Sequence, residues 1–134
     1  PPRSTLFPYT TLFRSAFAST DGIHINEHFG WCKEFYLYEL DGGEFKFVKI
    51  IESKDEIQDE LDKLTYKIDS IQEANIVCVA QIGPKASTMV KTANIYPLKS
   101  VNENELISDF LNTLLNLINT NPPLWLKAVL ARSV

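Results

Sequence analysis

Residues 21–32 hold the side chains best suited to chemistry, including the only two histidines of the chain. His24 and His28 offer imidazole nitrogens, which are good ligands for iron and zinc. Cys32 adds a thiol, which becomes a ligand where its pKa is lowered. The histidine spacing is not the zinc-protease motif, because that motif needs a helix and a suitably placed glutamate. We interpret the segment as a candidate metal-binding loop at a strand end, with an ordinary solvated turn as the alternative.

A second candidate site lies at residues 81–87, where a predicted strand ends and a helix begins. Gly83 precedes the helix, and the free backbone N–H groups of a helix start attract anions. Lys85 adds a positive charge beside them. An ordinary strand-to-helix connection has the same composition, so both interpretations stay open. Cys78, inside the preceding apolar run, is typical of an inert core residue.

Motifs for catalysis are missing from the sequence. We find no nucleophile elbow, no Walker loop and no dinucleotide-binding glycine motif. Asp21 and Glu39 could hold Mg²⁺ from adjacent strands, but nothing in the sequence singles them out. From the residues alone we therefore assign no catalytic group.

The composition narrows the possible partners. Thirteen lysines and arginines stand against 17 aspartates and glutamates, which gives a net charge of −4. This balance disfavours nucleic acid, because phosphate binding needs clustered cations. No apolar run reaches the roughly 18 residues of a membrane helix. Two distant cysteines form neither a disulfide framework nor a zinc site. We expect a cytoplasmic protein that binds neither nucleic acid nor membrane.

The first fifteen residues stand apart from the rest of the chain. Residues 1–15 match, without a mismatch, the translation of a DNA adapter commonly ligated to fragments for short-read sequencing. We therefore expect an artefactual segment that packs poorly, with the first native strand beginning at Ala16 and the natural start lying upstream. Residues 16–134 then form a single domain, long enough to bury a core without disulfides or a structural metal.

The remaining sequence predicts alternating strands and helices. Strands are predicted at residues 16–20, 34–40, 44–51, 75–82 and 95–101. Asp41, Gly42 and Gly43 indicate a hairpin, because glycine supplies the positive φ of tight turns. Residues 75–82 are continuously apolar, which is typical of a strand buried on both faces, and Pro97 favours a sheet edge. Helices are predicted from a cap at Ser53 to Ile71, from Pro84 to a cap at Asn94, from Asn102 or Asn104 to Asn119, and near the C-terminus. This order predicts an α/β fold with a mixed sheet and helices on its faces.

Together these segments resemble the dinitrogenase iron–molybdenum cofactor biosynthesis family, whose members include NifX, NafY and the carboxyl-terminal domain of NifB. The similar stretches occur in order and with similar spacing: AFASTDGIHINEHFG, FYLYE, DKLTYKI, NIVCVAQIGPKA, IYPLKS and NPPLWLKAVL. The DG…HFG element and the PPxWL ending are the most specific parts. The ending points to NifX-like or NafY-like members rather than to the NifB domain.

The resemblance implies a ribonuclease-H-like fold with a sheet of about five strands. It also implies a carrier that binds the iron–sulfur cluster precursor of the iron–molybdenum cofactor. The carrier delivers this cargo to a cofactor-assembly scaffold or to apo-dinitrogenase. The histidine of the family's HFG element, His28 here, is the one associated with cluster binding. His24, Cys32, Gly83 and Lys85 are further candidates for cofactor binding from their chemistry and position alone.

The small number of cysteines is consistent with a carrier. Iron–sulfur clusters are anionic, and imidazole with a helix start can hold an anion loosely, whereas four thiolates would hold it too tightly to release. Two alternatives remain open. The chain could be a fragment of a larger radical-SAM cluster synthase that has this domain at its carboxyl end. It could also be a metal-dependent nuclease, although such a site needs several clustered carboxylates.

Overall fold

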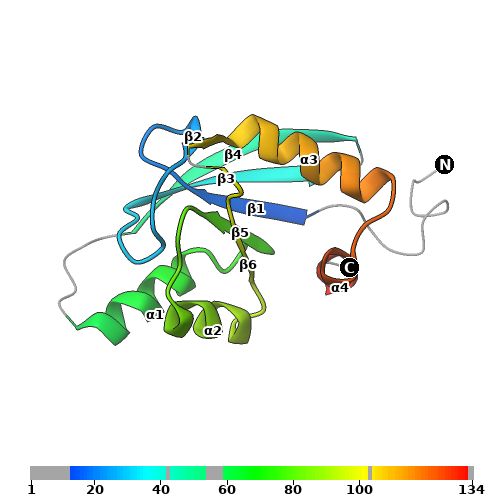
Figure 1. The fold of residues 1–134 in the computed structure, drawn as a ribbon. Helices are drawn as coiled ribbons and strands as arrows, with labels where there is room; N and C mark the ends of the chain where they lie inside the picture. The colour runs from blue at the N-terminus through cyan, green and yellow to red at the C-terminus, as the bar shows by residue number, and fades with distance from the viewer. Residues whose placement is uncertain (1–12, 42, 54–58, 103, 133–134) are drawn as a thin grey trace.

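The computed structural model describes residues 13–41, 43–53, 59–102 and 104–132. Its elements are β1 (Phe13–Ala18), β2 (His24–Ile25), β3 (Glu34–Asp41), β4 (Glu44–Glu52), α1 (Glu60–Ser70), β5 (Ile76–Val79), α2 (Pro84–Thr92), β6 (Tyr96–Lys99), β7 (Glu105–Leu106), α3 (Ile107–Asn119) and α4 (Leu124–Arg132). Figure 1 shows a central sheet with helices on both sides. Within the described ranges, no helix combines the length and apolar character needed to span a bilayer.

The central sheet has five strands in the order β4-β3-β1-β5-β6. β1 and β3 run antiparallel, as do β3 and β4, whereas β1, β5 and β6 run parallel to one another. The predicted mixed sheet is therefore confirmed, and the strand that contains Pro97 lies at its edge. β2 and β7 form a separate two-stranded sheet. The ribonuclease-H-like topology that the resemblance implies remains a prediction.

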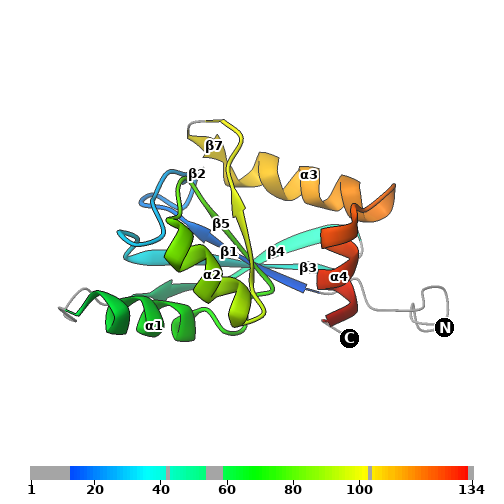
Figure 2. The same ribbon diagram turned by 60° about the horizontal axis from the view of Figure 1, so that its bottom comes forward.

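Each face of the sheet is covered by helices that bury a core of their own. Figures 1 and 2 show α1 and α2 together on one face and α3 on the other. Along β5, Val77 and Val79 belong to the core under α1 and α2, whereas Ile76 and Cys78 belong to the core under α3 and α4. All four side chains are buried, so the continuous apolar run was correctly interpreted as a strand covered on both faces.

The first strand begins at Phe13 rather than at Ala16, so the expectation of poor packing is wrong for residues 13–15. Phe13 is buried and pairs with Leu40, and the N–H of Arg14 donates to Oδ1 of Asn75 at 2.9 Å. The physical reason is that backbone groups form the hydrogen bonds between strands. Residues of almost any type can therefore extend β1 along the edge of β3 that does not pair with β4. Residues 1–12 lie outside the described residues.

The helix starts also differ from the predictions. Asp59, rather than Ser53, caps α1, because its side chain accepts from the N–H of Asp62 at 3.0 Å. Ser53 is buried, and its N–H donates to the carbonyl of Lys33. The rest of the predicted capping box lies outside the described residues.

α3 begins after Leu106 and has no side-chain cap, so the predicted caps at Asn102 and Asn104 are wrong. The pairing of β7 with β2 delays the helix, because it holds the preceding residues extended and the N–H of Ile107 donates to the carbonyl of Ile23. The described segment around the predicted caps forms a turn in which Asn104 has a positive φ of 55°.

Candidate functional site

His28 lies just beyond the carboxyl end of β5. It pairs with Gln81 in an isolated parallel bridge, and the N–H of Phe29 donates to the carbonyl of Gln81 at 2.8 Å. The N–H of Ala80 donates in turn to the carbonyl of Glu27 at 2.9 Å. The loop therefore continues the sheet past the ends of its parallel strands. This edge is where open α/β sheets place their ligands.

The backbone around His28 folds into a tight turn that directs side chains in opposite directions. The carbonyl of His28 accepts from the N–H groups of Trp31 at 3.1 Å and Cys32 at 3.0 Å. Phe29 is completely buried against Phe35, whereas His28 is exposed and Trp31 is 75% exposed. The buried phenylalanine thus anchors the loop while the imidazole remains open to solvent.

One hollow, of about 340 Å³, borders His28 on the side of α2. Its lining includes His28, Trp31, Gly83 and Lys85, and we call it the Trp31 hollow. Gly83 is the N-cap of α2 and supplies no side-chain cap, which leaves the helix start to face other acceptors. Three of the predicted site residues therefore meet here, with Trp31 as an exposed rim.

A second hollow, of about 440 Å³, borders His28 on the side of β6. We call it the Lys99 hollow, and its described lining includes Asn26, Gln81, Lys99 and Ser100 beside His28. The sequence analysis missed it. One signal was available, because Lys99 and Ser100 follow a predicted strand just as Gln81 follows the strand before it.

The charge of the two hollows is opposite to that of the whole chain. Their described linings contain Lys85, Lys99 and His28 but no carboxylate, in a protein of net charge −4. Neither lysine forms an ion pair within the described ranges, whereas Lys46 and Lys49 are paired with Glu39 and Glu73. The surroundings of His28 therefore favour an anionic ligand.

Cys32 is not brought to either hollow. Its thiol is buried and donates to the carbonyl of Glu34 at 2.8 Å. Burial raises the pKa of Cys32 to about 11, which disfavours the thiolate that a metal would need. Cys78 is also buried, and desolvation raises its pKa well above the usual value. We leave both cysteines out of the site.

His24 lies on β2 and lines neither hollow that His28 borders. Its Nδ1 is 2.8 Å from Oδ2 of Asp21, whose other carboxylate oxygen accepts the N–H groups of Ile23 and His24. These bonds, led by the backbone N–H of His24, hold the pKa of Asp21 well below its usual range. The structure therefore ties His24 to the turn and separates it from the hollows at His28.

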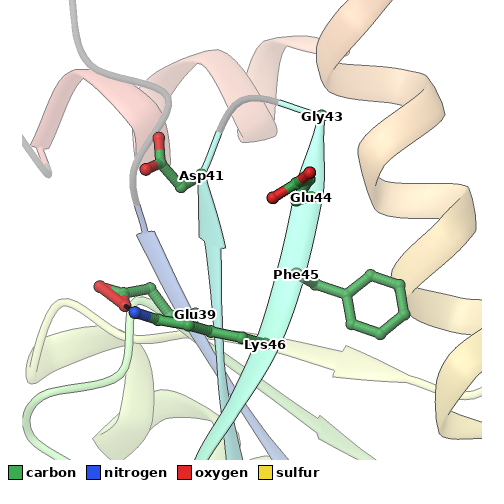
Figure 3. A pocket seen from close by; sticks show the side chains of 6 residues that line it. All are labelled: Glu39, Asp41, Gly43, Glu44, Phe45 and Lys46. Atoms are coloured by element: carbon green, nitrogen blue, oxygen red, sulfur yellow. Dashed lines mark ion pairs between the residues drawn. The ribbon is translucent and has the colours of Figure 1, made fainter.

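A third hollow, of about 620 Å³, lies at the β3–β4 hairpin. Figure 3 shows Glu39, Asp41 and Glu44 around it, with Lys46 reaching Glu39 at 3.3 Å. β1 pairs with β3 from Phe13 opposite Leu40 to Ala18 opposite Phe35, so the hairpin and the His28 loop lie at opposite ends of the sheet. Its carboxylates make this hollow unsuited to an anion.

No group of three or more histidines, cysteines or acidic residues within the described ranges could hold a metal ion. Among the described residues that line the two hollows, His28 is the only histidine, and no cysteine or carboxylate accompanies it. Such a site can hold a metal-containing anion through one coordination bond and several electrostatic contacts.

The chain is similar to known proteins of one family. The model of the family described as "Dinitrogenase iron-molybdenum cofactor" matches residues 12–116. Protein NifX of Sinorhizobium fredii is 31% identical over 128 residues, covering 90% of this chain and 79% of the relative. The FeMo cofactor biosynthesis protein NifB of Bradyrhizobium diazoefficiens is 38% identical over 77 residues, covering 55% of this chain and 15% of that protein.

A solved structure shows the same fold. The crystal structure of mj0327 from Methanocaldococcus jannaschii matches with a TM-score of 0.59 at 15% identity, covering 78% of this chain and 88% of that chain. The family match spans the sheet, α1, α2 and both hollows beside His28. The chain belongs to the dinitrogenase iron–molybdenum cofactor family.

Proposed function

We propose that this chain binds an anionic iron–sulfur precursor of the iron–molybdenum cofactor at His28 and passes it on during nitrogenase cofactor assembly. One observation supports this above all. An exposed imidazole stands between two hollows whose described linings contain no carboxylate and offer two lysines that form no ion pair with any described residue. The family and its NifX and NifB relatives supply the class of cargo.

The physical logic is that of a carrier rather than a catalyst. His28 gives one coordination bond, and Lys85, Lys99 and the start of α2 give attraction that water and salt weaken. Thiolates hold iron–sulfur clusters more firmly, and the two cysteines are buried away from the site. Cargo held in this way can leave when a partner offers more ligands. The proposed recipients are a cofactor-assembly scaffold and apo-dinitrogenase.

The test is anaerobic reconstitution with ferrous iron, sulfide and a small thiol, followed by gel filtration and absorption spectroscopy. We expect the wild-type protein to retain the brown chromophore and His28→Ala to lose most of it. His24→Ala is the matched control, because the second histidine lies outside both hollows, and it should retain the chromophore. Equal retention by His28→Ala and the wild-type protein would overturn the site.

A second candidate is suggested by the similarity to NifB, which covers only 15% of that longer protein. In this case the chain is one domain of a larger cluster synthase, and the hollows hold the product of the neighbouring domain. The NifX relatives favour the separate carrier, because they match over most of both chains. Genomic sequence upstream of the codon for Ala16 would distinguish the two.

A further inference from the structure

Lys67 is a completely buried lysine on the helix that packs against the His28 loop. One turn earlier on α1, Leu64 helps to line the Trp31 hollow. Phe29, Cys32 and Leu64 belong to the same buried core. The Lys67 side chain therefore ends inside the protein, directly beneath the loop that presents the imidazole.

The ammonium of Lys67 donates a hydrogen bond to the carbonyl of Cys32. The N–H of the same residue, Cys32, donates to the carbonyl of His28 at 3.0 Å. Two consecutive hydrogen bonds thus connect α1 to the backbone of His28. The Lys67 Nζ also lies 6.0 Å from the centre of the Phe35 ring, at the start of β3 where the loop ends.

Burying an ammonium group in a protein core is energetically unfavourable. Removing a charge from water costs several kcal/mol unless hydrogen bonds compensate it. An apolar side chain of similar size is often as stabilising or more so. An apolar residue could not reproduce the bond to the Cys32 carbonyl, which lies at the base of the loop.

We propose that Lys67 is the positioning residue of residues 27–32, holding the loop in the conformation that presents His28 between the two hollows. Lys67 does not touch the cargo and acts through the backbone of Cys32. Its expected effect on cargo binding rests on the proposed function, whereas its effect on the loop does not. The positioning role of Lys67 and the proposed function can therefore be tested, and rejected, separately.

The test compares Lys67→Met with Ile71→Val by amide hydrogen exchange. Met keeps the apolar stem and removes the donor. Ile71→Val removes one methyl group from the same core, and the backbone bonds of Ile71 within the described residues go to Ile68 and Ala74 rather than to the loop. We expect the Trp31 and Cys32 amides to exchange at least about tenfold faster in Lys67→Met and at the wild-type rate in Ile71→Val. Equal protection in both variants would overturn the proposal, whatever happens to cargo binding.

Cargo retention after anaerobic reconstitution is the second readout. We expect Lys67→Met to lower affinity by about ten- to a hundredfold, as residues that orient a metal ligand do, with Ile71→Val near the wild type. Faster exchange without loss of affinity would keep the positioning role and count against His28 as the ligand.

A measurement on the wild-type protein covers the case in which Lys67→Met does not fold. A scalar coupling across the hydrogen bond from the Lys67 Nζ to the Cys32 carbonyl carbon, detected by NMR, is expected together with slow exchange of the ammonium protons. Fast-exchanging ammonium protons with no coupling would overturn the proposal.

Discussion

His28 and Gln81 pair side by side in a parallel bridge, with Gln81 two residues beyond the end of β5. This pairing sets the imidazole at the meeting point of two hollows, because Gln81 lines both of them. The neighbouring bond from the N–H of Phe29 to the carbonyl of Gln81 fixes the register. The position of the candidate ligand thus depends on the sheet edge and not on a free loop.

Replacing Lys85 or Lys99 by Gln should weaken binding of the reconstituted cluster. Each lysine borders one hollow and has no ion-pair partner among the described residues, so its charge is available to an anion. We expect a loss of about two- to fivefold for each variant, or roughly 0.5–1 kcal/mol, together with a weaker dependence on salt. Lys91→Gln, exposed in the last turn of the same helix as Lys85, is the control. An equal loss in the control would indicate that only net charge matters.

Cys32 should not be needed for cargo binding, and its effect on stability should depend on pH. Cys32→Ala is expected to retain the reconstituted cluster as the wild-type protein does. Burial raises the folded thiol's pKa from 9.0 to about 11. As pH rises from 9 towards 11, the unfolded thiol loses its proton first, so wild-type stability falls relative to Cys32→Ala.

Thermal unfolding of both proteins across this pH range checks the Cys32 prediction. A constant difference in Tm would mean that the thiol is accessible in the folded protein. Loss of the chromophore in Cys32→Ala at neutral pH would return this residue to the list of ligands.

Gly22 should tolerate no side chain, whereas Gly30, nearer to His28, should accept one. Gly22 has a φ of +75°, and a Cβ there would lie 2.6 Å from Cε2 of Tyr36. The left-handed conformation alone costs an alanine about 1–2 kcal/mol. A Cβ on Gly30 meets no atom within 4 Å. Urea unfolding should show a clear loss for Gly22→Ala and a change within about 0.5 kcal/mol for Gly30→Ala. Similar midpoints for both variants would contradict the geometry of the turn.

Local sequence signals predicted much of the fold. Glycines after Asp41 indicated the hairpin, the apolar run around Cys78 indicated the central strand, and Pro97 indicated the edge, because each feature depends on a few neighbouring residues. The starts of α1 and α3 were predicted less well. Several polar residues could cap each helix, and the choice at α3 depends on the pairing of Ile25 with Glu105, which lie far apart in the sequence.

The sequence predicted those site residues whose positions depend only on where a strand ends. His28, Gly83 and Lys85 meet because a loop and a helix start adjoin the same end of β5. The burial of Cys32 could not be predicted, because it results from a turn closed by the carbonyl of His28. The part played by Lys67 was equally hidden, since it comes from α1, 35 residues away from the carbonyl it contacts.

Ser15, in β1, carries a buried polar group that makes no hydrogen bond within the described residues. Its hydroxyl is completely buried and has no hydrogen-bond partner in the described structure. A buried polar group without a partner costs about 1–3 kcal/mol. Ser15→Ala should therefore stabilise the protein by about 1 kcal/mol and raise Tm by a few degrees.

Ser19, directly after the end of β1, is the matched control. It is equally buried, but its hydroxyl bonds the carboxylate of Asp21 at 3.1 Å and accepts the N–H of Gly22 at 2.9 Å. Ser19→Ala leaves these groups without their partner and should lower Tm, opposite in sign to Ser15→Ala. A lower Tm for Ser15→Ala would contradict this prediction and show that the Ser15 hydroxyl has a partner.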